Sequence, residues 1–136
     1  MTGRWSSARL ADIPTDRTAE WWQQWSRTPD YGAGWHAIRK HLGIEGFGVN
    51  AVEADEGEEL IVPHTEVGYG DQEELYYLVA GRARFVLDGE EVELGAGELL
   101  YLRPEVEREA TALATPTLLF MVGGTPGKPY QDWEEM

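Results

Sequence analysis

A hairpin pattern at residues 82–94 constrains the fold of this chain more than any other feature. Every second position from 83 to 87 is apolar, which is the period of a strand that buries one face. Asp88-Gly89 follows, and this dipeptide supplies the two positive-φ positions of a tight turn. Residues 90–94 then alternate again, with acidic side chains between the apolar ones. The pattern predicts two antiparallel strands in a sheet with one buried face.

Similar short strand patterns recur on both sides of this hairpin. The further strands that we expect are residues 47–52, 60–64, 75–79, 99–102 and 117–122, separated by glycines and polar loops. The polar stretch from 103 to 114 carries no strand pattern. Roughly seven or eight short strands with no convincing helix between them predict an all-β sandwich or antiparallel β-barrel over residues 46–124.

The first 45 residues predict a short helical segment that packs on the barrel. Residues 18–26 place Trp21, Trp22 and Trp25 on one side at helical spacing. Tryptophan carries a large apolar surface. We therefore expect these rings to pack over an open face of the barrel rather than to stack on a ligand.

A second short helix is expected over residues 35–42, because the segment ends at Gly43, a residue type common just past a helix. Its two histidines, His36 and His41, are expected at the surface.

The C-terminal tail, residues 125–136, is polar and contains two prolines. We expect it to lie over the surface, anchored by Tyr130 and Trp133.

Composition and charge exclude several classes of function. The chain has 136 residues, the usual size of one domain. Its 25 acidic and 11 basic residues give a formal charge of −14, which repels nucleic-acid backbones and anionic membrane surfaces. Cysteine is absent, so disulfides and thiolate chemistry are excluded. No apolar run reaches the roughly 18–20 residues of a bilayer span, and none resembles a secretory signal. We expect a cytoplasmic protein that binds neither nucleic acid nor membrane.

One group of polar residues falls on the buried face of the predicted strands. Side chains two apart on a strand share a face, so His64 and Glu66 point the same way if the strand continues past Pro63. Glu74 likewise shares a face with Tyr76. A histidine, two carboxylates and a phenol are costly to bury unless they are paired or coordinate an ion. They form the candidate site.

These segments also carry a family resemblance. Residues 63–66 and 72–81 resemble the first motif of the cupin superfamily, which has two histidines one residue apart, then a glutamate and a later glycine. The interval from Glu74 to Gly81 matches, as do the hairpin and the glycine turn that follow. The resemblance spans about residues 47–123 and is nearest to small single-domain bacterial cupins with one conserved barrel. It implies a double-stranded β-helix (jelly roll) and, frequently, a homodimer.

The metal ligands that the resemblance implies are only partly present. Metal-binding cupins usually take two histidines and a glutamate from the first motif and a histidine from the second. Here His64 and Glu74 match, Glu66 replaces a histidine, and Arg108 stands near the last expected position. A guanidinium is always protonated and cannot bind a metal, whereas it pairs readily with a carboxylate. The register leaves open which of three neighbours points into the barrel: Glu107, Arg108 or Glu109.

The first functional hypothesis is a pocket that binds a small organic, anionic ligand without a metal. Arg108 would pair with the ligand's charge, and Glu66 and Tyr76 would also contact it. His64, Glu74 and Tyr76 would be the catalytic groups. Because an unperturbed imidazole has a pKa of about 6.5, acid–base chemistry of the isomerase, cyclase or lyase type would follow.

Two alternatives stay open. One is a dioxygenase or isomerase in which His64, Glu66 and Glu74 hold one divalent metal, Fe, Mn, Ni or Zn, as a facial triad. The other is a non-catalytic dimeric sensor or interaction module, since open strand edges need covering. The arginine favours the metal-independent hypothesis, so no cofactor is expected. The ligand itself cannot be identified, because one fold serves many chemistries.

Overall fold

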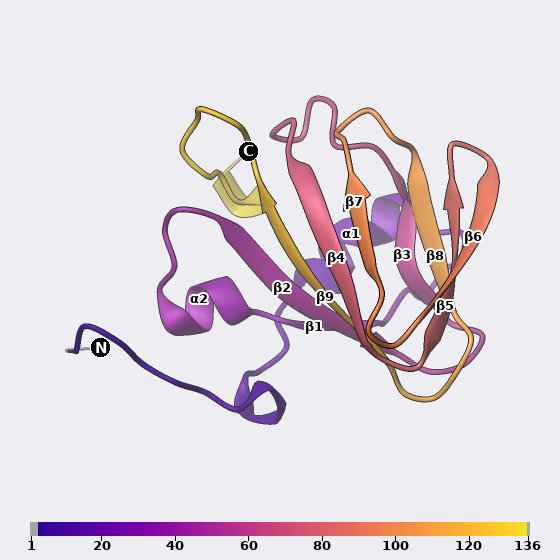
Figure 1. The fold of residues 1–136 in the computed structure, drawn as a ribbon, viewed down its shortest axis with the longest axis horizontal. Coiled ribbons are helices and arrows are strands. Elements are labelled where there is room, and N and C mark those ends of the chain that lie inside the picture. Colours follow the sequence, from indigo (N-terminus) through magenta and orange to yellow (C-terminus); the bar gives the residue numbers. More distant parts are fainter. Residues whose placement is uncertain (1–2, 136) are drawn as a thin grey trace.

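Two antiparallel sheets packed face to face make up the fold (Figure 1). The computed structural model describes residues 3–135. The five-stranded sheet has the order β1 (Gly34–His36), β2 (Gly48–Ala54), β9 (Thr117–Gly124), β4 (Glu73–Ala80), β7 (Leu99–Leu102). The four-stranded sheet has the order β3 (Glu59–His64), β8 (Arg108–Ala112), β5 (Arg82–Leu87), β6 (Glu90–Gly95). This architecture confirms the all-β antiparallel prediction. Residues 1–2 and 136 of the expected terminal segments lie outside the described part.

The hairpin expected at residues 82–94 is present as β5 and β6. Its register pairs Leu87 with Glu90 across the turn. Asp88 has φ 50° and Gly89 has φ 85°, so both lie in the left-handed region that a two-residue turn requires. Arg82 and Arg84 on this hairpin are exposed, which agrees with a solvated outer face.

The core lies between the sheets and is filled by alternate side chains of both. Each large apolar side chain buried there contributes about 1.5–3 kcal/mol to folding. The largest fully buried apolar members are Val52, Leu60, Ile61, Val62, Tyr76, Leu78, Phe85 and Leu119. This core holds β3 and β4 in fixed positions, and these two strands carry the candidate site.

Short helices precede and follow the sheets. They are η1 (Leu10–Asp12), α1 (Thr18–Trp22), η2 (Gln23–Trp25), α2 (Ile38–Leu42) and η3 (Trp133–Glu135). The expected helix over 18–26 is present as α1 continued by η2. Its start is held by Asp16, whose carboxylate accepts a hydrogen bond from the backbone N–H of Thr18 at 3.0 Å. A bilayer-crossing helix is absent from residues 3–135, where every helix is too short or too polar.

The helix expected over residues 35–42 is wrong in its first part. Trp35 and His36 belong to β1, which pairs with β2, and only Ile38–Leu42 is helical. Trp35 is buried and its indole Nε1 donates to the Tyr31 hydroxyl at 2.9 Å, so tertiary packing overrides the local pattern. His41 is exposed as expected, but His36 is half-buried, with Nδ1 2.8 Å from the carbonyl of Ile13.

A strand that the sequence pattern missed is β8, which lies inside the polar stretch at 103–114. It joins β3 and β5. Its residues alternate between buried and half-buried, but the buried ones are small alanines and one arginine. Alanine and arginine have weak strand propensity, so the pattern gave little signal.

The outer face of the five-stranded sheet is covered over only part of its width. Ile13 and Ile38 pack on Val49 and Ala51 of β2. The outward side chains of β4 and of the edge strand β7 are exposed: Leu75, Tyr77, Val79, Leu99 and Tyr101.

Candidate functional site

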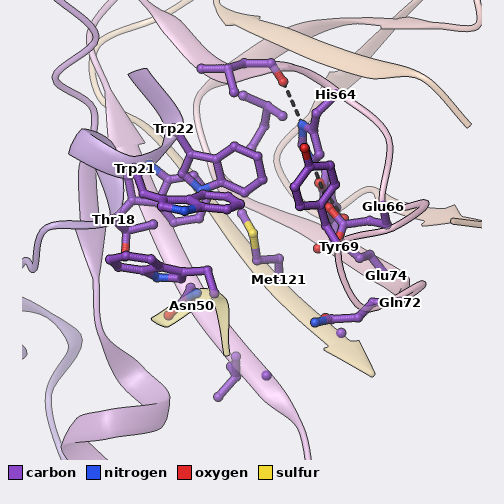
Figure 2. A pocket seen from close by; sticks show the side chains of 18 of the residues that line it. Thr18, Trp21, Trp22, Asn50, His64, Glu66, Tyr69, Gln72, Glu74 and Met121 are labelled. Carbon is purple, nitrogen blue, oxygen red and sulfur yellow. Dashed lines mark hydrogen bonds and ion pairs between the residues drawn. The ribbon is translucent and has the colours of Figure 1, made fainter. Parts of the chain in front are cut away.

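A pocket opens where α1, β1 and the C-terminal tail meet the strands β2, β3, β4 and β9. Its cavity volume is about 80 Å³. Figure 2 shows Trp21 and Trp22 on one side of it and His64, Glu66 and Glu74 on the other, with Met121 between them. We call His64, Glu66, Glu74 and Tyr76 the acidic wall. We call Trp21, Trp22, Trp35, Tyr130 and Trp133 the aromatic wall.

The backbone of β3 and the turn after it aim the first two members of the acidic wall. The pairing of β3 with β8 shifts register between Ile61 and His64, and such a bulge re-aims the side chains that follow it. The backbone N–H of Glu66 donates to Pro104, and its carbonyl accepts from both Tyr69 and Asp71. This tight turn holds the carboxylate of Glu66 in a buried position opposite His64.

The His64 ring has a defined orientation. Its Nδ1 lies 2.8 Å from the carbonyl oxygen of Val62, and because a carbonyl only accepts, Nδ1 carries a proton. Its Nε2 lies 2.8 Å from Oε2 of Glu66. An unprotonated Nε2 and a carboxylate oxygen would both be acceptors, so this distance requires a proton, or a cation, between them. The two side chains therefore form a buried pair poised to give or take a proton.

Glu74 occupies the middle of the wall. It lies on β4 between Leu102 of β7 and Gly123 of β9. Its Oε1 accepts hydrogen bonds from the Tyr76 hydroxyl at 3.0 Å and from Arg108 Nη1 at 2.6 Å.

Burial sets the ionisation of this carboxyl and of its phenol partner. Burial and the neighbouring Glu66 raise the pKa of Glu74 to about 7, although Arg108 and His64 oppose the rise. Burial and the Glu74 charge hold the pKa of Tyr76 well above its ordinary value, so this hydroxyl keeps its proton and donates.

Arg108 lies behind the acidic wall and does not line the pocket. Its side chain is fully buried. Besides the bond to Glu74, Nη2 donates to the carbonyl of Arg103 at 2.7 Å, and Nε and Nη2 both reach the carbonyl of Val106. The expectation that Arg108 pairs with an anionic ligand does not fit this geometry, because the guanidinium is already used within the protein. Of the three neighbours considered, Glu107 is exposed and Glu109 pairs with Arg27 at 2.6 Å, so Arg108 is the one that points inward.

The four tryptophan rings of the aromatic wall form a connected series of contacts. Trp21 lies edge-on to Trp22, with ring centroids 4.8 Å apart, and 5.6 Å from Trp133. Trp22 stacks on Trp35 at 6.2 Å and lies 4.3 Å from the ring of His64. Trp22 and Trp25 also pack against the core, as the sequence suggested. Trp21 and Trp22 have a second role that the packing hypothesis did not assign, because they face the pocket as well.

The tail reaches the pocket because α2 holds it. Arg39 pairs with Asp132 at 2.5 Å, and Lys40 pairs with Glu134 at 2.7 Å. The guanidinium of Arg39 also lies over the Tyr130 ring, 5.0 Å from its centroid. These contacts place Tyr130 and Trp133 against the pocket, so the tail anchors expected from the sequence also line the site.

Two glycines make room for this arrangement. Gly48 and Gly123 face each other across β2 and β9. A Cβ on Gly48 would lie 2.5 Å from Tyr130, and one on Gly123 would lie 2.7 Å from Oε1 of Gln72. A side chain at either position would displace a pocket residue.

Several lining residues gave no signal in the sequence. Asn50 lies on β2, and Tyr69 and Gln72 lie in the loop before β4. Isolated polar or aromatic residues of this kind are common at surfaces. Outside the acidic wall, the sequence indicated only the tryptophans of α1 and the aromatic residues of the tail. These are large rings in short polar segments, and such rings need a common surface to pack against.

The acidic wall also offers a donor set for a metal. One atom each of His64, Glu66 and Glu74 lie within 4.8 Å of one another. The hydrogen bond that Nδ1 donates to the carbonyl of Val62 fixes the tautomer that leaves Nε2 directed at the carboxylates, which is the usual support for a ligating histidine. One nitrogen and two carboxylates suit Fe(II) or Mn(II), so the residues fit such an ion.

Comparison with known proteins gives the family. A cupin-domain family model matches residues 53–123. A search of curated proteins gives no match. Among solved structures, a cupin protein from Bacteroides fragilis is 20% identical over 79% of this chain and 88% of its own, with a TM-score of 0.60. A cupin 2 conserved-barrel domain protein from Salinispora arenicola is 18% identical over 71% and 79% of the two chains, with a TM-score of 0.57.

A third similar structure is described as that of an enzyme. It is a sugar phosphate isomerase of the cupin superfamily from Silicibacter pomeroyi, 19% identical over 79% of this chain and 74% of its own, with a TM-score of 0.57. At these identities the structures agree in fold alone. The family model spans more than half of the chain and includes every residue of the acidic wall. The chain belongs to the cupin family.

Proposed function

We propose that this cupin binds a small organic molecule between the two walls and moves a proton on it. The observation that carries the proposal is the distance of 2.8 Å between Nε2 of His64 and Oε2 of Glu66, with Nδ1 already committed to Val62. A buried proton held between two groups of this kind is available to a ligand in the pocket. Isomerisation by proton transfer at a carbon beside a carbonyl is the reaction class that requires the fewest groups besides this acid–base pair.

Each member of the acidic wall has a distinct part in this proposal. The His64–Glu66 pair gives or takes the proton. Tyr76, which donates to Glu74, holds that carboxyl in place, and Arg108 supports it from behind. Arg108 is therefore a positioning residue and not a ligand contact.

The aromatic wall supplies the other half of the site. The rings of Trp21 and Trp22 cover the ligand and limit access of water, which strengthens the polar interactions inside.

Solvent exchange tests the proposal directly. The wild-type protein is incubated in D₂O with a pool of small amines, ketones and hydroxy acids, and mass spectrometry follows deuterium incorporation at carbon. We expect incorporation into at least one compound with the wild type and a loss of about 10²-fold or more in the His64→Gln and Glu66→Gln variants. The matched control is His41→Gln, since His41 is exposed and does not line the pocket. Incorporation by both active-site variants at the wild-type rate would overturn the proposal.

A divalent metal at His64, Glu66 and Glu74 is the second candidate, favoured by the fixed tautomer of His64. When bound, such an ion polarises a ligand oxygen or activates a water molecule. The residues of the wall would hold the ion, and Arg108 would keep its bond to Glu74.

Elemental analysis of protein purified without a histidine tag tests this candidate. Stoichiometric Fe, Mn, Ni or Zn in the wild type and in His41→Ala, but not in His64→Ala, would support it. An unchanged melting temperature on addition of these ions to metal-free protein, together with no metal as purified, would exclude it.

A homodimer also remains a proposal. The exposed apolar side chains of β4 and of the edge strand β7 form the surface that a second copy could cover. Sedimentation of the wild type and of Leu99→Lys at micromolar concentration tests it. A dimer that becomes a monomer in the variant is the expected result, and a monomeric wild type would contradict it.

A further inference from the structure

Two carboxyl groups line the pocket, and among the described lining residues the only positive charge beside them is the proton that His64 and Glu66 share. Glu66 and Glu74 line it, whereas none of the described residues that line it is a lysine or an arginine. The remaining polar lining groups are neutral amides, hydroxyls and the His64 ring. A carboxylate or phosphate on a ligand would therefore meet two carboxyl groups and, apart from the proton shared by His64 and Glu66, no compensating charge.

The cation nearest to the acidic wall is turned away from the ligand. Arg108 is fully buried and each of its three nitrogens donates to a protein oxygen. A ligand anion could recruit this guanidinium only by displacing Glu74 or the backbone carbonyls. The buried geometry makes that exchange costly, because each lost bond leaves a polar group without a partner.

The opposite wall is built of π-faces and ring edges. Trp21 contacts both Trp22 and Trp133, and Tyr69 lies 6.0 Å from Trp21. The face of an indole attracts a cation within about 6 Å, most strongly when water is excluded. The same chain already uses this interaction at its tail, where Lys40 lies over Trp133 at 5.5 Å.

The cavity limits the size of the ligand. A volume of about 80 Å³ accommodates on the order of six ordered waters. A compact head group with few non-hydrogen atoms fits this space, whereas a nucleotide or an oligosaccharide would have to extend out of it.

We infer that the pocket selects small organic ammonium compounds, with the positive nitrogen held between the carboxylates of Glu66 and Glu74 and the rings of the aromatic wall. This inference rests on the proposed function of the same pocket and names its ligand class. It replaces the anionic ligand that the sequence suggested, because the arginine expected to bind an anion is used inside the protein.

Three isosteric probes of different charge test the inference: choline, the neutral 3,3-dimethylbutan-1-ol and the anionic 3,3-dimethylbutanoate. Binding to the full chain is measured by titration calorimetry and by quenching of tryptophan fluorescence, in buffer with a chelator to remove metal ions. We expect choline to bind at least about tenfold more tightly than the neutral probe, and the anion to bind weakest. Equal or tighter binding of either other probe, or no saturable binding of choline below about 10 mM, would overturn the inference.

Matched variants assign the effect to the two walls. Trp21→Leu keeps an apolar side chain but removes the ring, so it should weaken choline about tenfold and leave the neutral probe within about twofold. Glu66→Gln should also reduce the preference for choline. Trp5→Leu is the control, because Trp5 is 80% exposed and does not line the pocket. An undiminished preference for choline in both pocket variants would place its binding elsewhere and overturn the inference.

The results separate this inference from the proposed function. Deuterium incorporation into a neutral or anionic compound, with no preference for choline, leaves proton transfer standing and removes the ammonium class. Preferential binding of choline without deuterium incorporation into any amine supports the ligand class and counts against the proton-transfer chemistry.

Discussion

The two walls of the pocket differ in how they are attached to the fold. The acidic wall sits on β3, β4 and the turn between them, and its members are joined by buried hydrogen bonds and ion pairs. The aromatic wall comes mainly from α1 and the C-terminal tail, held by ring contacts and by two ion pairs, of which Arg39–Asp132 is mostly buried and Lys40–Glu134 is more exposed. Segments with fewer buried contacts open at lower free energy than core strands. The difference places the candidate acid–base groups on strands of the core and the turn between them, and the rings that face them on segments outside these strands.

The largest expected effect comes from removing the support of the acidic wall. Arg108→Met leaves Glu74 and backbone carbonyls buried without their donor, and breaking a buried pair in this way costs about 3–5 kcal/mol. Urea denaturation measures the change in the free energy of unfolding. Arg84→Met is the control, since Arg84 is exposed and its loss should change stability by less than about 0.5 kcal/mol. A loss below about 1 kcal/mol for Arg108→Met would mean that the two walls do not differ in this way.

The attachment of the tail predicts the next effect. Asp132→Asn removes a mostly buried charge from its bond to Arg39, and charge-assisted hydrogen bonds contribute about 1.5–3 kcal/mol. Chemical denaturation compares the loss in the free energy of unfolding with that of Glu134→Gln. This control breaks a more exposed pair with Lys40 and should cost about 0–1 kcal/mol. The Asp132 variant should also weaken choline binding, because Trp133 is one residue away. Equal losses in the two variants would show that burial does not distinguish these two anchors.

A smaller effect should follow from filling the space beneath the tail. Gly48→Ala places a methyl group 2.5 Å from the Tyr130 ring, so the ring must move at a cost of about 1–2 kcal/mol. Gly124→Ala on the same sheet is the matched control, because a Cβ there meets nothing within 4 Å. The steric origin is checked in the Tyr130→Ala background, where Gly48→Ala should no longer destabilise the protein. A persistent loss in that background would assign the effect to the strand itself.

The smallest expected difference between the walls is in how the free energy of unfolding depends on pH. Burial raises the pKa of Glu74 to about 7 in the folded state, well above its value in the unfolded chain. A carboxyl with a raised folded pKa binds its proton more tightly in the folded state. Its contribution to stability is therefore full below about pH 4.5 and is lost as the pH rises through about 7.

The free energy of unfolding of the wild type relative to Glu74→Gln should accordingly fall by on the order of 1 kcal/mol between pH 5 and pH 8. Chemical denaturation at several pH values measures this difference. The control is Glu134→Gln in the tail, whose difference from the wild type should stay flat over the same range. A difference that rises with pH for Glu74→Gln would reverse the assigned direction of its pKa shift.

Much of the fold could be predicted from local pattern. The Asp88-Gly89 turn and the alternation around it required one hairpin, and the structure contains it. Trp35 and β8 were missed for a common physical reason. Both strands are stabilised by partners outside their own segment. The strand of Trp35, β1, pairs with β2, and β8 pairs with β3 and β5, and a local sequence pattern does not reveal such pairing.

The sequence predicted which polar residues form the site, but not the hydrogen bonds of Arg108 or the contacts of the aromatic wall. The period of two brought His64, Glu66, Glu74 and Tyr76 together, as the structure does. The direction of the Arg108 guanidinium could not be predicted, because it depends on which backbone carbonyls the turn at 103–106 presents. The aromatic wall depends on where two chain ends meet, and no spacing along the sequence encodes that meeting.

The separate origin of the aromatic wall has a consequence for how relatives of this chain are grouped. The segment matched by the family model, residues 53–123, contains the whole acidic wall and no residue of the aromatic wall. Two proteins could therefore be alike throughout that segment and still take different ligands, if their flanking segments differ. Classification of such chains by ligand should compare residues 18–35 and 130–133 together with the domain between them, because specificity can change there without any substitution in the domain itself.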